Sequence, residues 1–463
     1  MEKYFGEDWF QEKNIVVLGL ARSGLAVSKL LLRFGAKVTV NDQKPEAELT
    51  GIEELKSLGI HVIAGYHPED LIHSGIDLLV KNPGIPYTSS PIQKAQKLGI
   101  PVITEIELAY AWSAAPIVGI TGSNGKTTTT SLVGKILDQA HKNPIVAGNI
   151  GTVLCEKAVD TRPDEILVAE LSSFQLKGTI HFRPQMACLL NVSPAHLDYH
   201  GTWDDYIKSK AMLFSNMKGQ DIAILNADSL ECQEVAKHIT CEIIWFSRIR
   251  EVDRGSFVKE GTVYFRNKQG SEEKIISTEE IAIPGAHNLE NALAATAICK
   301  AWGVDGSDIR HVLTTFQGVE HRLEFVSELG GVKFYNNSKA TNAEATIKAL
   351  ESFKEPIVLI AGGLDRGFDF EELVPLLKQR VKALVAYGQT KEKFMKIGKL
   401  AGLNLLSVVD NVSEAVLEAN TLADSGDIVL LSPACASWDM YSSFEERGSI
   451  FKETVHKLKT SLH

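Results

Sequence analysis

Residues Ile117-Val-Gly-Ile-Thr-Gly-Ser-Asn-Gly-Lys-Thr127 decide the fold of this chain, because they form an apolar run that passes into a glycine loop. Five residues, rather than the four of the G-x-x-x-x-G-K-[ST] pattern, separate the first and last glycines of the run. Gly122 and Gly125 still permit a tight turn whose N–H groups point inward. Lys126 can reach the β- and γ-phosphates of a nucleotide, and Thr127 offers a hydroxyl to Mg²⁺. The stretch predicts a phosphate-binding loop between a strand and a helix, and the alternative is a glycine loop that only caps a helix.

Length and composition indicate a folded protein of several domains. The 463 residues exceed what one hydrophobic core usually holds, which predicts about three domains. The 48 basic and 58 acidic side chains give a formal charge of -10, which argues against non-specific binding to nucleic acid or to an anionic membrane. The sequence shows neither a membrane span nor the apolar core of a signal peptide. We therefore expect a cytoplasmic protein.

The cysteines support the same compartment. They lie far apart, without a C-x-x-C pair or a nearby pair of histidines, so neither a disulfide framework nor a zinc site is indicated. We expect small, buried, apolar side chains in a reducing environment. The six positions are Cys155, Cys188, Cys232, Cys241, Cys299 and Cys435.

The first segment, residues 14–42, has the order strand, glycine turn, helix, strand and acid. This is the order of a dinucleotide-type βαβ unit whose helix N-terminus faces a phosphate. Ala21 replaces the middle glycine of G-x-G-x-x-G, which hinders a pyrophosphate and favours another nucleotide over NAD or FAD. Asp42 could accept hydrogen bonds from a ribose or a base, or simply cap a helix. After the next strand, Asn82 and Gly84 could line the same crevice.

Two strands after the glycine loop are predicted to bring polar side chains to its edge. Residues 165–170 form a strand with Glu170 at its far end. In a doubly wound sheet that end lies beside the phosphate loop, so Glu170 is placed to hold the nucleotide's metal. A later strand, within residues 187–192, is followed by His196. A single histidine is more often structural, but this position favours a metal or phosphate role.

Two helical stretches carry further candidates. Lys208 and Lys210 lie on a helix over residues 203–214 and cannot share a face, so helical position alone predicts that both are solvated. Asn288 and Asn291 are three residues apart on one helix face and could read an amide-bearing base. The alternative for this pair is an N-cap and a surface residue.

The third segment begins near Glu320. Its strands, over residues 356–363, 383–388 and 427–432, alternate with helical stretches. This pattern predicts a third α/β sheet of parallel type, with loops for a ligand at its carboxyl edge. The predicted fold class is therefore α/β with three domains: a Rossmann-like first domain, a central P-loop domain with a mostly parallel sheet, and a Rossmann-like third domain.

Taken together, the motifs resemble those of the Mur ligases, which build the peptide of the bacterial cell-wall precursor. The resemblance covers nearly the whole chain and implies a UDP-sugar-binding domain over residues 1–114, a central ATP-binding domain over 115–322 and an amino-acid-binding domain over 323–463. It also implies a monomer. The segments that carry it are Thr121–Thr127, Glu170–Gln175, Asn191–Asp198, His287–Asn291, Glu320–Arg322, Asn337–Asn342 and Leu431–Asp439.

Ser338–Asn342 and Ser432–Ser437 look most like the family members that add D-glutamate. The resemblance then implies transfer of the γ-phosphate of ATP to the alanine carboxylate of UDP-N-acetylmuramoyl-L-alanine, and attack of D-glutamate on the resulting acyl phosphate. Lys126 and Arg322 would balance the phosphate charge. One Mg²⁺ would be held by Thr127 and Glu170, and a second would lie near His196. In this family a helix lysine is carbamylated by CO₂ to support that second metal, and Lys210 matches it.

The remaining site residues are also implied by the resemblance. ATP would be held by Gly122, Ser123, Asn124, Gly125, Lys126, Thr127, Thr128, Asn288, Asn291, Arg322 and Asn337. The UDP-sugar would contact Ser23, Asp42, Asn82, Gly84 and Asn149, and D-glutamate would contact Lys339, Thr341, Arg366, Ser437 and Phe444. Two positions depart from the pattern of some members, because Asn337 replaces an aspartate and Arg366 replaces a lysine, which changes a point charge into a fork.

Other functions stay open on these grounds. A sister Mur ligase could add another amino acid, although the third segment lacks the Asp-Asn-Pro-Arg segment of the diaminopimelate- and lysine-adding members. A folylpolyglutamate synthase shares the loop and the modified lysine but not the domain before Ala114. A nicotinamide dehydrogenase is disfavoured by Ala21, whereas a non-catalytic nucleotide-binding scaffold would keep every binding residue.

Overall fold

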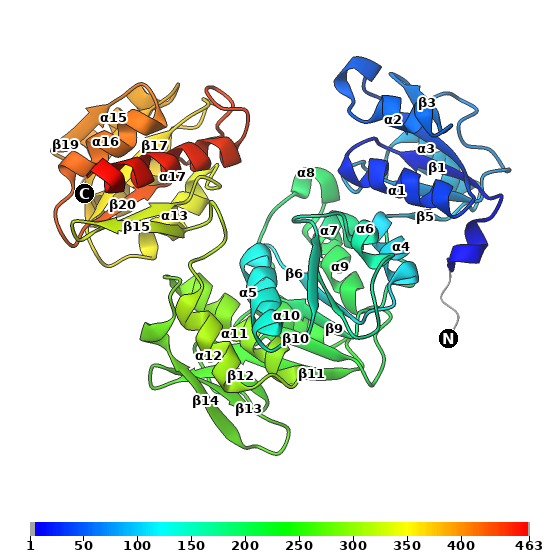
Figure 1. Cartoon of the computed structure of the whole chain (residues 1–463), viewed down its shortest axis with the longest axis horizontal. Helices are drawn as coiled ribbons and strands as arrows, with labels where there is room; N and C mark the ends of the chain where they lie inside the picture. Colours follow the sequence, from blue (N-terminus) through cyan, green and yellow to red (C-terminus); the bar gives the residue numbers. More distant parts are fainter. Residues whose placement is uncertain (1–4, 462–463) are drawn as a thin grey trace. The chain divides into compact units, whose positions relative to one another are not determined.

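The computed structural model of the chain describes residues 5–461. Its backbone forms three α/β parts, each built on its own sheet (Figure 1). The contacts divide these parts into two compact units. The first unit comprises the residues up to Thr278 together with Glu290–Val312, and the second comprises Glu279–Leu289 and the residues from Leu313 onward. None of the helices in the described part has the length and hydropathy of a membrane-spanning segment.

The first sheet confirms the predicted Rossmann-like fold. Its five strands are all parallel, in the order β3-β2-β1-β4-β5, so the chain reverses direction across the sheet between β1 and β4. A crevice for ligands lies beyond the carboxyl ends of strands at such a point. The elements are η1 (Glu7–Phe10), β1 (Asn14–Leu18), α1 (Arg22–Arg33), β2 (Lys37–Asp42), η2 (Glu46–Glu48), α2 (Ile52–Ser57), β3 (His61–Ala64), β4 (Leu78–Lys81), α3 (Ser90–Lys97), β5 (Val102–Ile103) and α4 (Glu105–Trp112).

The central sheet has nine strands in the order β14-β13-β12-β11-β10-β9-β6-β8-β7. The strands from β6 to β12 pair in parallel, so β6, which leads into the glycine loop, lies between β8 and β9. The strands are β6 (Ile117–Thr121), β7 (Pro144–Gly148), β8 (Ile166–Glu170), β9 (Met186–Leu189), β10 (Ile222–Asn226), β11 (Glu242–Ser247), β12 (Gly255–Lys259), β13 (Thr262–Arg266) and β14 (Glu272–Ser277). The helices are α5 (Lys126–Gln139), α6 (Leu154–Ala158), α7 (Ser173–Leu176), α8 (Leu197–His200), α9 (Trp203–Ala211), η3 (Met212–Phe214), α10 (Leu230–Ala236), η4 (Thr278–Glu280), α11 (Ala286–Ala301) and α12 (Gly306–Thr315).

An antiparallel extension, β12 to β14, was not part of the sequence-based prediction. The signal for its first hairpin is nevertheless present. Glu260 and Gly261 separate β12 from β13, a strand of alternating burial, and both adopt positive φ angles, 49° and 69°. A two-residue turn of this kind matches the twist of the flanking strands, and glycine takes such a φ at little cost.

The third sheet has the order β15-β16-β20-β17-β18-β19. Its pairs are parallel as expected, except that β15 runs antiparallel to β16, so the sheet is mostly rather than wholly parallel. The elements are β15 (Glu324–Leu329), β16 (Val332–Asn336), α13 (Ala343–Glu351), β17 (Ile357–Gly362), η5 (Glu371–Leu373), α14 (Val374–Arg380), β18 (Val381–Tyr387), α15 (Lys391–Leu400), β19 (Leu405–Val408), α16 (Val412–Leu422), β20 (Ile428–Leu431) and α17 (Phe444–Ser461).

One continuous hydrophobic core underlies the first two sheets. It includes Phe10 and Trp112 of the first part and Leu154 of the second, and α4 packs against α6. The Phe34 and Trp112 rings contact each other at a tilt of 55°, with their centroids 4.9 Å apart. All six cysteines are buried and unbridged, as predicted. The first two sheets are therefore joined by packed side chains as well as by the chain itself.

Helix α4 carries two buried carboxylates at this junction. Glu107 accepts hydrogen bonds from the backbone N–H groups of Ile180, His181 and Phe182, at 2.9, 2.7 and 3.1 Å. Glu105 accepts from Cys155 N and Gln175 Nε2, both at 3.1 Å. Burial raises the pKa of Glu105 to about 7, against the smaller opposing effect of these hydrogen bonds. Part of the Glu105 population is therefore a neutral acid near neutral pH.

The raised pKa of Glu105 predicts a pH-dependent stability. Because the folded chain keeps this proton to a higher pH than the unfolded chain, the contribution of Glu105 is complete below pH 4.5 and is lost as pH rises through about 7. We expect Glu105→Gln to remove this loss. Urea unfolding between pH 5 and 8 should show the variant gaining stability relative to the wild type up to about pH 7 and levelling off above it.

The exposed Glu53 provides the control, since Glu53→Gln should follow the wild type across this range. Parallel curves for Glu105→Gln and the wild type would contradict the assignment.

Candidate functional site

The glycine loop passes closely against α11. Gly125 has a φ of +83°, and a Cβ atom at this position would lie 2.2 Å from the Oδ1 atom of Asn291. Only glycine fits there without displacing that side chain. Thr129, on the first turns of α5, also donates to Asn291 Oδ1 at 3.3 Å. The structure therefore brings Asn291 beside the loop. Asn288 is also buried on α11 and donates to the carbonyl of Pro284 at 2.7 Å.

Two lysines meet at one carbonyl oxygen of the loop. Lys126 Nζ donates to the carbonyls of Gly122 and Ser123, at 2.9 and 3.1 Å. Lys210 Nζ also donates to the carbonyl of Gly122, at 2.9 Å. The expectation of a solvated Lys210 is wrong, because the side chain is only 2% exposed. By contrast, Lys208 lies on the outer face of α9 and pairs with the exposed Asp204 at 2.6 Å.

Helix α9 is held against the loop by Tyr206. The Tyr206 hydroxyl lies 2.9 Å from Ser123 Oγ, and Lys210 Nζ lies 4.7 Å from the centre of the Tyr206 ring. Packing against the loop therefore buries Lys210. This burial, together with the charge of Lys126, lowers the pKa of Lys210 well below its usual value. Its amine is accordingly neutral at a pH where an ordinary lysine is charged.

Glu170 ends β8, where its backbone pairs with Ile120 of β6. Its Oε1 atom accepts a hydrogen bond from Asn149 Nδ2 at 2.8 Å. Its Oε2 atom is buried and has no hydrogen-bond partner among residues 5–461. An unpaired buried carboxylate oxygen is costly unless a cation or a donor meets it. Glu170 therefore has an oxygen available to a cation, and its role as a metal ligand stays a prediction.

His196 lies at the start of α8 in a left-handed backbone conformation, with a φ of 54°. Its ring makes an edge contact with Phe174 at 5.0 Å. Burial, followed by the charges of Lys126 and Lys210, lowers the pKa of His196. A neutral imidazole has a free lone pair and can bind a metal.

The chemistry of these groups fits Mg²⁺, which prefers oxygen ligands and keeps several waters. Thr127 and Glu170 supply oxygens at this edge of the sheet. Within residues 5–461, no three side chains of His, Cys, Asp and Glu are grouped as a complete metal site. A metal here would therefore take its other ligands from water and from the phosphates of a nucleotide.

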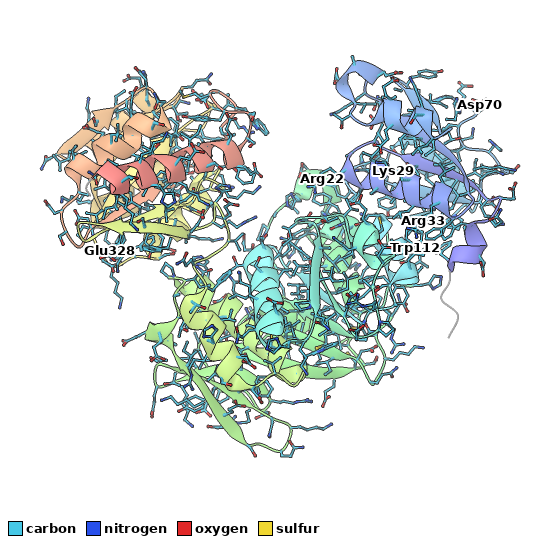
Figure 2. The ribbon with its side chains drawn as sticks, in the orientation of Figure 1. Arg22, Lys29, Arg33, Asp70, Trp112 and Glu328 are labelled. Atoms are coloured by element: carbon cyan, nitrogen blue, oxygen red, sulfur yellow. The ribbon has the colours of Figure 1, made fainter. Side chains whose placement is uncertain are left out.

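A cavity of about 360 Å³ lies where the first two parts of the chain meet. It brings together four predicted substrate residues, Ser23, Asn82 and Gly84 of the first part and Asn149 of the second. Asn82 Nδ2 donates to Ser23 Oγ and the Gly84 N–H donates to Asn82 Oδ1, both at 3.1 Å. Arg22, labelled at the start of α1 in Figure 2, also lines the cavity and donates to the carbonyl of Gly151.

Asp42 does not line this cavity. Its carboxylate accepts hydrogen bonds from the backbone N–H groups of Leu20, at 2.7 Å, and Lys44, at 2.9 Å. It thus fixes the turn that follows β1. The predicted contact of Asp42 with the UDP-sugar stays a prediction.

In the second unit, two of the predicted D-glutamate residues are cations that lie over aromatic rings. Lys339 Nζ lies 3.7 Å from the centre of the Phe444 ring, and the Arg366 guanidinium lies 5.1 Å from the Trp438 ring. Ser437 is buried. Thr341 is half-buried and Arg322 is exposed. A cationic side chain that packs on an aromatic face can also bind a carboxylate ligand.

The sequence analysis missed Arg447, which is completely buried within α17. It donates to the Ser338 hydroxyl and carbonyl, at 2.9 and 2.7 Å, and to the Cys435 carbonyl at 3.1 Å. Asn337 is likewise engaged within this unit, because its amide donates to Ser432 Oγ and accepts from the Leu323 N–H, each at 3.2 Å. In the sequence, Arg447 is indistinguishable from the charged residues that helices expose.

Models of three protein-family domains match most of the chain. Sequence models of the Mur ligase MurD-like N-terminal domain, the Mur ligase middle domain and the Mur ligase glutamate ligase domain match residues 13–104, 120–299 and 321–435. Among solved structures, UDP-N-acetylmuramate-alanine ligase MurC of Thermotoga maritima superposes with a TM-score of 0.58 at 19% identity, covering 97% of this chain and 99% of that one. MurF of Acinetobacter baumannii gives a TM-score of 0.60 at 18% identity, with 98% and 93% covered. These two similarities concern the fold alone.

Curated relatives are much more similar in sequence. The UDP-N-acetylmuramoylalanine--D-glutamate ligase of Geobacillus sp. strain WCH70 is 50% identical over 97% of this chain and 99% of its own length. The enzyme of the same name from Bacillus cereus strain ATCC 14579 is 49% identical over 97% of this chain and 98% of its own length. On this similarity, which extends through all three parts of the fold, the chain belongs to the Mur ligase family.

Proposed function

We propose that this chain is the ATP-dependent ligase that joins D-glutamate to UDP-N-acetylmuramoyl-L-alanine in peptidoglycan precursor synthesis. The carrying observation is the identity of about half of all residues, over nearly the full length, with relatives that bear this activity in their names. The buried phosphate-loop centre and the cavity next to it support the same reaction, since they offer cationic, metal-binding and amide groups within one unit.

Each part of the chain has one task in this proposal. Residues 1–114 bind the UDP-sugar, residues 115–322 bind ATP, and residues 323–463 bind D-glutamate. Ser23, Asn82 and Gly84 contact the nucleotide sugar, together with Asn149 across the cavity. Lys339 and Arg366 meet the carboxylates of D-glutamate, and Thr341, Ser437 and Phe444 complete its pocket. The protein acts in the cytoplasm as a monomer.

The chemistry joins three negatively charged partners. The alanine carboxylate attacks the γ-phosphorus of ATP, ADP leaves, and the amine of D-glutamate then attacks the acyl phosphate, so that inorganic phosphate leaves as the amide forms. Lys126 and Arg322 offset the phosphate charge, and the N–H groups of the glycine loop orient the phosphates. Thr127, Glu170 and His196 would hold Mg²⁺, which when bound supplies charge neutralisation and a fixed geometry. Asn288 and Asn291 would read the amino group and ring nitrogens of the adenine.

Lys210 is carbamylated in this proposal. A neutral lysine amine attacks CO₂, forms an N–C bond and releases one proton, which leaves an anionic carbamate. The reaction needs an uncharged amine, and both the burial of Lys210 and its low pKa supply one. The carbamate would lie against Lys126, which shares the Gly122 carbonyl, so its charge has a partner of opposite sign.

Phosphate release tests the reaction directly. With ATP, Mg²⁺ and UDP-N-acetylmuramoyl-L-alanine, the purified protein should release phosphate when D-glutamate is added and not when L-glutamate, L-lysine or no amino acid is added. Mass spectrometry should find the D-glutamyl product. Release that depends on another amino acid would indicate a sister ligase, and none under any pairing would indicate a binding protein.

Carbamylation predicts a specific loss and rescue. Lys210→Ala should lower kcat by about 100-fold, the upper range for groups that support a metal's ligands, and short carboxylic acids should restore part of it. Labelled ¹³CO₂ should give a carbamate NMR signal in the wild type and none in Lys210→Ala.

Lys208→Ala is the matched control, because Lys208 lies on the same helix but on its exposed face. It should keep both the activity and the carbamate signal. A Lys210→Ala protein that keeps the signal, or that acids do not rescue, would count against the modification.

A further inference from the structure

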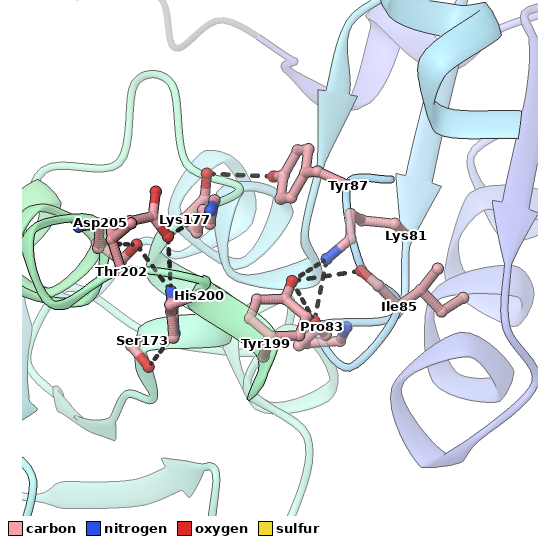
Figure 3. Close-up of polar contacts among 11 residues, drawn as sticks. Lys81, Pro83, Ile85, Tyr87, Ser173, Lys177, Tyr199, His200, Thr202 and Asp205 are labelled. Atoms are coloured by element: carbon pink, nitrogen blue, oxygen red, sulfur yellow. Dashed lines mark hydrogen bonds and ion pairs between the residues drawn. The ribbon is translucent and has the colours of Figure 1, made fainter. Parts of the chain in front are cut away.

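Lys81 lies directly behind the turn that lines the substrate cavity. It ends β4, immediately before Asn82, and its side chain is buried. Its Nζ atom donates to the Pro83 carbonyl at 3.0 Å and to the Tyr199 hydroxyl at 3.2 Å (Figure 3). Across residues 5–461, no carboxylate forms an ion pair with it. Burial, followed by the charge of Lys177, lowers the pKa of Lys81 to about 7.

The Tyr199 hydroxyl connects this turn to the central part of the chain. Tyr199 belongs to α8, the short helix that His196 begins. Its oxygen accepts the hydrogen bond from Lys81, and its single hydrogen lies between the carbonyls of Pro83, at 3.0 Å, and Ile85, at 3.3 Å. One hydroxyl of α8 thus holds both sides of the turn around Gly84.

A second connection runs from the same segment to α9. The Tyr87 hydroxyl donates to the Lys177 carbonyl at 3.2 Å. Lys177 Nζ in turn pairs with Asp205 at 2.6 Å, and Asp205 lies 2.9 Å from His200 Nδ1 (Figure 3). Asp205 is on the helix that carries Lys210. The segment after β4 is therefore tied to both helices that bear the proposed metal and carbamate groups.

Neither Lys81 nor Tyr199 lines the cavity, so any effect on a ligand must pass through the turn or through a neighbouring side chain. The Tyr199 ring does pack edge-on against Phe174, which lines the cavity, at 4.5 Å. Asn82 and Gly84 face the cavity from the other side of the same turn. The buried Lys81 and the half-buried Tyr199 thus control how the nucleotide-binding turn is placed relative to α8.

We propose that Tyr199 and Lys81 are positioning residues that align the acceptor end of the sugar nucleotide with the phosphate loop, by holding the Asn82–Gly84 turn against α8. This role rests on the proposed function for the identity of the substrate. The bonds that shape the turn itself, from Asn82 to Ser23 and from Gly84 to Asn82, do not involve Tyr199. Loss of the Tyr199 hydroxyl should therefore leave binding of the uridine diphosphate end intact and impair only ligands that extend to the central part.

The test compares two ligands of different length. Tyr199→Phe and Lys81→Met are each measured by calorimetry with UDP alone and with UDP-N-acetylmuramoyl-L-alanine, and then by steady-state kinetics. We expect the Kd of UDP and the KM of ATP to stay within about twofold of the wild type. We expect kcat/KM for the sugar nucleotide to fall at least tenfold, since misplacement by about 1 Å can cost up to about 100-fold.

The double variant and a control complete the design. If both side chains act on one turn, the double variant should lose little more than the worse single variant. Tyr264→Phe removes a hydroxyl from β13, in the antiparallel extension, and should change none of these constants.

Three outcomes would overturn the proposal. Unchanged kinetics would show that the connection is dispensable, and equal losses for UDP and the sugar nucleotide would show damage to the turn itself. Fully additive losses in the double variant would show that Lys81 and Tyr199 act independently of each other. If the wild type binds the sugar nucleotide but releases no phosphate, the proposed function fails, while the ratio of the two Kd values still decides the positioning role. A wild type that does not bind the sugar nucleotide would overturn both.

Discussion

The chemistry of the central part depends on a single carbonyl oxygen, that of Gly122, which accepts hydrogen bonds from two lysines at once. Two ammonium groups this close in a buried place repel one another, so the structure favours one charge over two. Burial and the charge of Lys126 lower the pKa of Lys210, so Lys210 is the amine that the proposed carbamylation would use. The unpaired oxygen of Glu170 balances this arrangement with negative charge at the neighbouring strand end. The charges of the site are therefore fully balanced only when its ligands are bound.

The sheets make this convergence possible. Parallel strands bring their carboxyl ends to one edge, so β8 and β9 present their final residues on either side of the loop that follows β6. The first sheet does the same at its reversal between β1 and β4, where Ser23 and Asn82 meet. One hydrophobic core runs beneath both edges. The distance between the cavity and the phosphate loop is therefore set by packed side chains, and the polar connections of Lys81 and Tyr199 refine it.

The sequence predicts the location of a functional residue wherever that location follows from the residue's position along a strand. Glu170 could be placed beside the phosphate loop because a strand end has only one location in such a sheet. Lys210 could not, because the exposure of a helix face depends on which element packs against it, and only family resemblance pointed to that residue. The burial of Lys81 and Arg447 was not predicted for the same reason, because a buried lysine or arginine cannot be told from a solvated one in the sequence. The hairpin formed by β12 and β13 has a sequence signal in its two-residue turn, Glu260-Gly261, but none of the predicted ligand residues lies in this hairpin.

The two edge strands of the nine-stranded sheet are poorly suited to pairing with a strand of another molecule. At one edge, β14 begins with Glu272, Glu273 and Lys274, all exposed, and at the other, β7 begins with Pro144, which has no N–H to offer. Charges and proline at an edge discourage the addition of a strand from another molecule. Large parallel sheets assemble slowly, because their pairings join distant parts of the chain. Protected edges therefore matter most during synthesis, when many incomplete copies are crowded together and mutual aggregation competes with folding.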